Sequence, residues 1–250
     1  MRRNIEKRGI NMNMKEEYDK KYFEKTAEDA GLLLKKRRPL WSRWTRIIRK
    51  YEASGKLLDV GCGPGFFLAY AEKHYDVHGI DISEYAIRKA KQRTRTAKLS
   101  VGDATDLDCK NDYFDIVTCF DLLEHLPNPG LALQEFRRIL RDGGILIIRV
   151  PNTESIGAKW KKEEWFGHRD KTHVSLLSNE EWINLLKDTN FKILEVFYDG
   201  LWDTPYFNHI PSILQDIFIK IPFLLLFLLG VKFPKKYGEN LCVIAKKAMK

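Results

Sequence analysis

Short apolar runs alternate with amphipathic segments from residue 55 to about residue 150. The apolar runs have the length of buried strands and lie at residues 56–60, 76–80, 97–101, 114–120 and 144–150. The segments between them space their apolar residues three and four apart, which predicts helices at residues 66–73, 84–93 and 131–140. This alternation predicts the α/β class, with a parallel sheet covered by helices on both faces.

Three more elements follow in the second half of the chain. Ser178 begins a capping-box sequence, which predicts a helix over residues 180–189. Apolar runs at residues 191–199 and 240–248 predict two further strands. The segment between them, at about residues 200–239, is too long for a structureless loop in a compact domain. We therefore expect this insertion to have its own structure and its own purpose.

The most apolar part of that insertion is KIPFLLLFLLGVKFPKK, residues 220–236. Nine residues, 223–231, carry no polar side chain, which is short of the ~20 residues that span a bilayer. A single span between two strands of one sheet would also separate those strands, so we expect no transmembrane helix. The remaining interpretations are a lid or dimer contact, or a hairpin that lies in a membrane interface. For the hairpin, we expect lysines at the level of the lipid headgroups: Lys220, Lys232, Lys235 and Lys236.

The net charge of +9 comes from the amino-terminal part of the chain. Residues 1–50 hold 16 Lys and Arg against 7 Asp and Glu, and the remainder is balanced. Residues 40–51 also place apolar side chains on one helical face, so we predict a basic helical cover over residues 1–54. This basic surface is either solvated or in contact with anionic lipid. No nucleic-acid-binding motif accompanies it, so we do not expect nucleic acid as a partner.

The four cysteines are far apart and form no CxxC pair. This spacing argues against a disulfide framework or a zinc site of the CxxC kind, and it fits a reducing cytosol. The first residues contain charges but no apolar run of the secretory type. We therefore expect a cytoplasmic protein, with membrane association through the insertion and the basic segment.

A glycine turn joins the first predicted strand to its helix in LLDVGCGPGFFLAYAEK, residues 57–73. Glycines at this place let a ligand approach the backbone closely. The pattern is GxGxG and not the GxGxxG of dinucleotide sites, because Phe66 occupies the third position. Asp59 precedes the turn, and Asp81 and Asp103 end the next two strands. Three acidic strand ends favour a nucleoside that carries positive charge, with Asp81 placed for the ribose hydroxyls.

The segments DVGCGPG, GIDIS, VGDATDL, FDIVTCFDLLEHLPNP and LRDGGILIIRVPN resemble the class I S-adenosylmethionine-dependent methyltransferases. The resemblance implies a Rossmann-like three-layer sandwich over residues 55–250. Its sheet is seven-stranded and mostly parallel, in the order 3-2-1-4-5-7-6 with strand 7 antiparallel. It also implies S-adenosylmethionine as the cofactor. The cofactor-binding residues that it implies are Asp59, Gly61, Cys62, Gly63, Gly65, Asp81, Ile82, Gly102, Asp103, Ala104, Phe120 and Asp121.

The segment LLEHLPNP is similar to small-molecule and quinol O-methyltransferases, and the motifs of nucleic-acid base methyltransferases are missing. We therefore expect a small, apolar or lipid-like acceptor that is methylated at oxygen. Candidates for the base are His125, His168 and His173. Asp121, Glu124 and His125 also have helical spacing that suits a divalent metal, but we favour a structural His125 and predict no metal. Asp170 could likewise hold the loop that carries His168 and His173.

Two other functions remain open at this point. The first is a methyltransferase of a soluble metabolite, in which the insertion forms a dimer interface. The second is a noncatalytic partner protein that binds S-adenosylmethionine. Measured turnover would separate the second from an enzyme.

Overall fold

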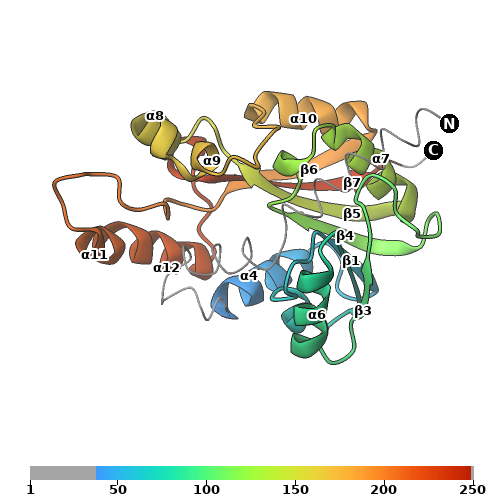
Figure 1. Cartoon of the computed structure of the whole chain (residues 1–250). Coiled ribbons are helices and arrows are strands. Elements are labelled where there is room, and N and C mark those ends of the chain that lie inside the picture. The colour runs from blue at the N-terminus through green and yellow to red at the C-terminus, as the bar shows by residue number, and fades with distance from the viewer. Residues whose placement is uncertain (1–37, 249–250) are drawn as a thin grey trace.

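Seven strands form one sheet in the order β3-β2-β1-β4-β5-β7-β6 in a computed structural model, which describes residues 38–248 (Figure 1). The strands are β1 (Lys56–Val60), β2 (Asp76–Asp81), β3 (Lys98–Val101), β4 (Phe114–Phe120), β5 (Leu140–Pro151), β6 (Phe191–Tyr198) and β7 (Asn240–Lys247). β1 to β5 pair in parallel, and β7 is antiparallel to both of its neighbours. The predicted fold class and strand order are confirmed.

Helices cover both faces of this sheet. One face packs against α7 (Pro129–Ile139) and α10 (Asn179–Asp188), and the other packs against α4 (Arg38–Ile48), α5 (Leu68–Ala71) and α6 (Glu84–Arg93). The central strands are therefore buried on both sides, which is why their sequences are mostly apolar and do not alternate with polar residues. Leu58 and Val117 join the core under α7 and α10, whereas Leu57 and Ile116 join the core on the opposite face.

The helices begin where the sequence provides caps. The Ser83 hydroxyl accepts a hydrogen bond from the Ala86 amide at 3.2 Å and caps α6. Ser178 and Glu181 form both bonds of a capping box at the start of α10, as predicted. Pro129 opens α7, where its missing amide proton has no cost.

Three boundaries differ from the predictions. β5 begins at Leu140, four residues before the predicted start, and α5 covers only Leu68–Ala71. The helix predicted over residues 40–51 is α4, which ends at Ile48. Helices predicted in residues 1–37 lie outside the described residues. α4 packs directly into the core on one face of the sheet, so whether residues 1–54 form a separate cover stays a prediction.

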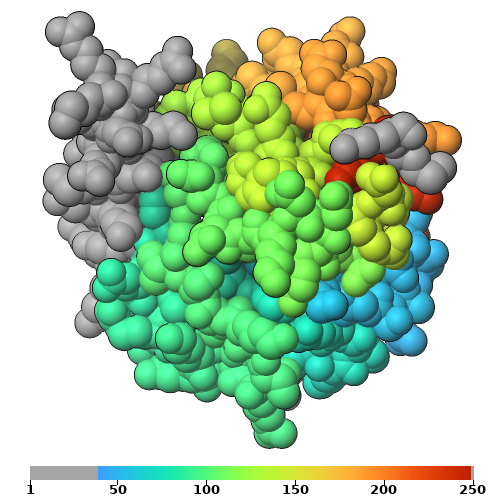
Figure 2. All heavy atoms as spheres, turned by 90° about the vertical axis from the view of Figure 1, so that its right-hand side faces the viewer, coloured from blue at the N-terminus to red at the C-terminus, as the bar shows by residue number. Residues whose placement is uncertain are grey.

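Two crossovers at the carboxyl edge of the sheet contain short helices. After β5 come α8 (Ile156–Lys161), η2 (Lys162–Glu164) and α9 (Phe166–Arg169), and after β4 comes η1 (Leu123–His125). Figure 1 shows α8 and α9 at the same end of the molecule as the insertion. Figure 2 shows the opposite end, where the segments from α6 to β5 make a closely filled surface with α10 above them.

The insertion between β6 and β7 is helical. α11 (Ser212–Gln215), a π-helical turn η3 (Asp216–Lys220) and α12 (Ile221–Leu229) follow one another without a break, and η4 (Lys235–Tyr237) precedes β7. Its two ends lie side by side, because the Phe233 amide donates to the Tyr198 carbonyl at 3.3 Å. Asp199 closes the base by accepting from the Asn240 backbone and side-chain amides at 3.0 and 2.7 Å.

This helical run is longer than the apolar stretch counted in the sequence. Ser212–Leu229 is 18 residues long with a mean hydropathy of 2.0, so by length and composition alone it qualifies as a candidate membrane span. The apolar run counted in the sequence understates the length of this helix, which extends through Lys220 and Pro222, and the expectation of no transmembrane helix stays a prediction. Only 11% of this run is buried.

Candidate functional site

The glycine turn after β1 has the conformation that its sequence requires. Gly61, Gly63 and Gly65 have φ values of +74°, +51° and +75°, which favour glycine. A Cβ atom at Gly65 would lie 2.9 Å from the Cβ atom of Ala90 in α6. Cys62 lies inside the turn with a buried side chain. The turn therefore brings backbone to the carboxyl edge of the sheet without side chains in the way.

Asp81 ties this turn to the end of β2. Its two carboxylate oxygens accept hydrogen bonds from the Gly63 and Ser83 amides, each at 2.8 Å. Burial raises the pKa of Asp81, although both hydrogen bonds act in the opposite direction. Ile82, next in sequence, is half-buried at the same edge.

Asp59 and the end of β3 complete this part of the site. Asp59 is buried and accepts a hydrogen bond from the Thr118 hydroxyl at 2.7 Å. Burial raises the pKa of Asp59 to about 7, and the charge of Asp81 adds to the effect. The Gly102 amide donates to the Asp81 carbonyl at 3.0 Å. Asp103 accepts from the Thr105 amide and hydroxyl, each at 2.8 Å, and Ala104 is buried.

Phe120 and Asp121 lie where β4 ends. Asp121 has a φ of +55°, and its amide donates to the Arg149 carbonyl at 3.0 Å. The Arg149 guanidinium donates from Nε to Asp121 Oδ1 at 2.8 Å and from a second nitrogen to Oδ2. Burial lowers the pKa of Arg149, but the Asp121 carboxylate outweighs it, so the pKa lies above its ordinary value. Arg149 is a lone charge in the apolar part of β5 and is not among the site residues predicted from the sequence.

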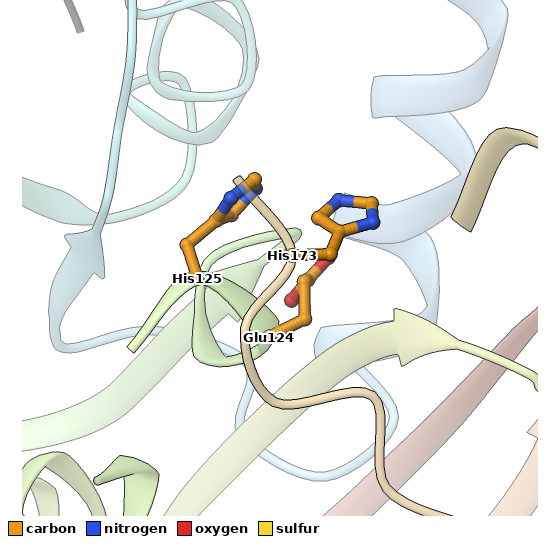
Figure 3. Close-up of side chains that lie close together, drawn as sticks. All are labelled: Glu124, His125 and His173. Carbon is orange, nitrogen blue, oxygen red and sulfur yellow. The ribbon is translucent and has the colours of Figure 1, made fainter. Parts of the chain in front are cut away.

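The structure brings two of the three predicted histidines together. The ring centroids of His125 and His173 are 4.6 Å apart, with the Glu124 carboxylate beside them (Figure 3). His168 lies elsewhere on the loop, because its Nδ1 is 2.8 Å from the Lys162 carbonyl and its ring packs edge-on against Trp165. The spacing in the sequence allowed Asp121 to join Glu124 and His125 in a metal site. In the structure, the Asp121 carboxylate is instead bound by Arg149.

The network around Asp170 is also present. Asp170 Oδ1 accepts from the Thr172 amide at 3.0 Å and from the Thr172 hydroxyl at 2.6 Å. Thr172 in turn contacts Nδ1 of His125 through its hydroxyl oxygen at 2.9 Å. Burial lowers the pKa of His125 to about 4, with nearby His173 acting in the same direction. His125 is therefore a neutral imidazole at pH 7, which is the form that accepts a proton.

These residues share one edge of the sheet, as the carboxyl ends of parallel strands do. Asp59 and Asp81 are buried carboxylates that accept hydrogen bonds from a hydroxyl and from backbone amides. A cationic ligand beside them would favour their charged forms. S-adenosylmethionine carries an ammonium group, a sulfonium group and a ribose diol, and these acceptors fit it.

The family of the chain follows from comparison with known proteins. Residues 33–196 match a family described as a methyltransferase domain, which is well over half of the chain. The chain belongs to this methyltransferase family. It is a class I S-adenosylmethionine-dependent enzyme, so the predicted family, activity and cofactor are confirmed.

Relatives and solved structures agree with this assignment. A protein of Methanocaldococcus jannaschii is 26% identical over 171 residues, which cover 68% of this methyltransferase and 80% of that protein. A ubiquinone biosynthesis O-methyltransferase of Thiobacillus denitrificans is 36% identical over 122 residues, which cover 46% of this chain. The match spans only 51% of that relative.

A solved methyltransferase structure from Archaeoglobus fulgidus shows the same fold. The two structures superpose with a TM-score of 0.65 at 20% identity, over 90% of this chain and 99% of that one. The likeness extends well beyond the segment that resembles the family in sequence. These comparisons show the family and the fold, and the roles of the individual site residues stay predictions.

Proposed function

We propose that this methyltransferase works at a membrane surface, where it transfers a methyl group to a hydroxyl of a lipid-like acceptor. The observation that carries this proposal is an exposed apolar helix that is packed, at one end, against the transfer site. The proposal takes the helical run Ser212–Leu229 to lie along the membrane and not across it. The insertion starts and ends at adjacent strands of one sheet, which supports that orientation.

The exposed apolar surface is large for a helix of a water-soluble domain. Leu229 is 81% exposed, Phe218 is 74% exposed and Leu225 is 53% exposed. Further exposed apolar residues of the insertion are Phe207, Ile210, Ile213, Leu214, Ile217, Leu226 and Val231. Contiguous apolar surface of this kind marks an interaction site. An interfacial helix of this composition binds by inserting its apolar side chains at the headgroup boundary.

Ion pairs within the protein weaken the electrostatic part of the predicted lipid contact. Lys220 lies 3.7 Å from Asp216, and Lys232 and Lys235 pair with Glu195 and Glu154. Three of the four lysines expected at headgroup level are therefore already neutralised. The apolar side chains carry the proposed membrane contact.

Two aromatic contacts connect α12 to the end of β4 at the candidate site. Phe227, on α12, is buried and lies with its ring centroid 6.1 Å from that of Trp44 on α4. The Trp44 centroid lies 4.8 Å from that of Phe120, which ends β4. The Arg43 side chain also donates to the Phe227 carbonyl at 3.0 Å, which holds the end of α12 in place. A helix that lies on the membrane would thus hold Phe120, at the end of β4, two aromatic contacts away from α12.

The names of relatives support an oxygen acceptor. Several of them are ubiquinone biosynthesis O-methyltransferases, at 34–36% identity over less than half of this chain. S-adenosylmethionine supplies a methyl group that is already electrophilic because its sulfur is positively charged. This chain's residues then have to orient the acceptor and take its proton, and neutral His125 and the nearby His173 are placed for that task.

Membrane binding is expected to be mostly independent of salt. Purified full-length protein should sediment with liposomes that contain anionic lipid, and it should remain bound at about 0.5 M NaCl, where surface charges are strongly screened. Leu225→Glu should weaken binding about 10–100-fold, because a buried leucine contributes roughly 1.5–3 kcal/mol.

Leu131→Glu is the matched control, since Leu131 is a 41% exposed leucine on α7. It should bind as the unmodified protein does. Equal loss in both variants, or no binding at low salt, would rule out the insertion as the membrane contact.

The acceptor class is tested with methyl-labelled S-adenosylmethionine and a whole-cell extract. Label should enter the organic phase after extraction, and Leu225→Glu should reduce this product more than Leu131→Glu does. Asp81→Asn serves as the control for the cofactor, because it disturbs the acceptor pair that holds the glycine turn. Label that enters only the aqueous phase would instead indicate a soluble metabolite, with the insertion as a lid or dimer surface.

A further inference from the structure

Three potential metal ligands converge at the carboxyl edge of the sheet. A Glu124 oxygen and one ring nitrogen each from His125 and His173 all lie within 4.8 Å of one another. Figure 3 shows that two come from the short helix after β4, whereas His173 comes from the loop after α9. Residues nearly fifty positions apart thus meet at one point.

Backbone hydrogen bonds hold the loop against the short helix. The Val174 and Ser175 amides both donate to the Glu124 carbonyl at 2.9 Å. The Ser175 hydroxyl donates to the Leu126 carbonyl at 2.6 Å. None of these bonds uses a ligand side chain, so the cluster does not hold the loop in place by itself.

The hydrogen bonds of each imidazole set its tautomer. His173 Nδ1 lies 2.7 Å from the Gly167 carbonyl, which only accepts, so Nδ1 carries the proton and Nε2 carries the lone pair. The Thr172 hydroxyl gives its proton to Asp170 and thus accepts from Nδ1 of His125. The Thr172 carbonyl also accepts from that nitrogen, at 3.2 Å. Metal-binding histidines show this pattern, in which a carbonyl or a carboxylate network fixes the far nitrogen.

One carboxylate oxygen of Glu124 is buried without a hydrogen-bond partner among the described residues. The residue is 1% exposed, and its Oε2 has no hydrogen-bond partner among the residues that the structure describes. Burying a polar atom without a partner costs free energy, and native structures contain few such atoms. A bound cation would remove this cost.

We propose that Glu124, His125 and His173 bind a divalent transition-metal ion of the zinc class. Two imidazoles and one carboxylate are a known zinc ligand set, and such a site keeps a position open for another ligand. Ligands around tetrahedral zinc lie about 3.4 Å apart, so the separations between the three atoms would have to shrink by up to roughly 1.4 Å. Asp170, whose Oδ2 lies 3.9 Å from His173 Nε2, is close enough to orient a water at that position.

The role of the ion rests on the function proposed above, and it would replace the proton-accepting role of His125 and His173, whose lone pairs would bind the ion. The open position would take the acceptor hydroxyl and lower its pKa. The proton then leaves to water or to a nearby base, and the acceptor oxygen bonds to the methyl carbon. The carbon–sulfur bond breaks, and its electron pair stays on sulfur. The inference that a metal binds does not depend on this role.

Metal binding is tested on tag-free, full-length protein after dialysis against a chelator. Zn²⁺ titrated in competition with a chromophoric chelator should bind at one site per chain, and Co²⁺ should give the visible absorption of a low-coordinate site. Glu124→Gln and His173→Gln should each lower the affinity for Zn²⁺ by at least the roughly 10–100-fold that loss of an outer-shell partner costs. His168→Gln, on the same loop but outside the cluster, should bind Zn²⁺ unchanged.

Two outcomes would overturn the inference, and a third would overturn only the role. Failure to bind Zn²⁺, or equal affinity in Glu124→Gln and the unmodified protein, would mean an adventitious ion only. S-adenosylmethionine binding, measured in parallel, shows that each variant is folded and tests the cofactor site separately. A Glu124→Gln variant that loses Zn²⁺ but keeps its rate of methyl transfer would make the ion structural and remove its proposed role.

Discussion

Replacing Trp44 by alanine is expected to lower the free energy of unfolding by about 3–5 kcal/mol. The side chain is fully buried between three aromatic rings, which belong to Phe120, Phe197 and Phe227 at centroid distances of 4.8, 5.8 and 6.1 Å. These rings come from β4, β6 and α12, so the cavity would open where three elements meet. Urea denaturation monitored by circular dichroism measures the change.

Trp160→Ala is the matched control for this substitution. Trp160 is 55% exposed on α8, so its removal should change stability by less than about 1 kcal/mol. Trp44→Ala should also speed proteolysis within residues 200–239, because α12 loses the ring contact between Phe227 and Trp44. A loss of stability below about 1 kcal/mol would show that Trp44 does not anchor the insertion.

Arg149→Met is expected to cost about 3 kcal/mol of stability and most of the methyl-transfer activity. Methionine keeps much of the side-chain volume but removes the positive charge. Asp121 then loses its ion-pair partner, and the buried carboxyl of Asp199 loses a nearby positive charge. Burial raises the pKa of Asp199 to about 6 even though Arg149 acts against it, so its pKa should rise further in the variant. Asp121 lies at the end of β4 with a φ of +55°, and it needs the guanidinium to fix its carboxylate.

A double-mutant cycle isolates the pair itself. Arg149→Met combined with Asp121→Asn should destabilise less than the sum of the two single changes, by about 1–3 kcal/mol. Each stability is measured by urea denaturation in the absence of cofactor. Additivity within about 0.5 kcal/mol would mean that the two side chains act independently.

Most of the fold was predictable because the central strands are buried on both faces. β4 is a mostly apolar run, and its predicted and observed limits coincide at residues 114–120. β5 starts four residues before the predicted limit, and the reason is a contact with other segments that the sequence of β5 does not show. Arg141 has polar neighbours but pairs with Asp115 and lies 2.5 Å from Glu52, so the backbone continues as a strand through it.

The cofactor site was predictable from the same principle. Parallel strands end at one edge, so residues that follow successive strands come together, as Asp59, Asp81 and Asp103 do. The contacts across loops were not predictable in this way. The pairing of Asp121 with Arg149, and the meeting of Glu124 with His173, depend on side-chain and backbone bonds between distant segments. A single sequence has no periodicity that reports such contacts, although a lone arginine in a buried strand is a usable signal.

The two ends of the insertion are joined to each other, which separates binding of the methyl donor from contact with the acceptor. Asp199 and Asn240 join its ends directly at the edge of the sheet, and the strands β6 and β7 pair without any help from residues 200–239. The sheet and the glycine turn can therefore stay constant while the segment between these two residues changes in length or chemistry, provided that the contact of Phe227 with Trp44 is kept, since lengthening a loop costs little. In evolution or in protein engineering, the insertion proposed to meet the acceptor could be replaced as one unit. A change of substrate could then be acquired in one step, without rebuilding the part that holds the methyl donor.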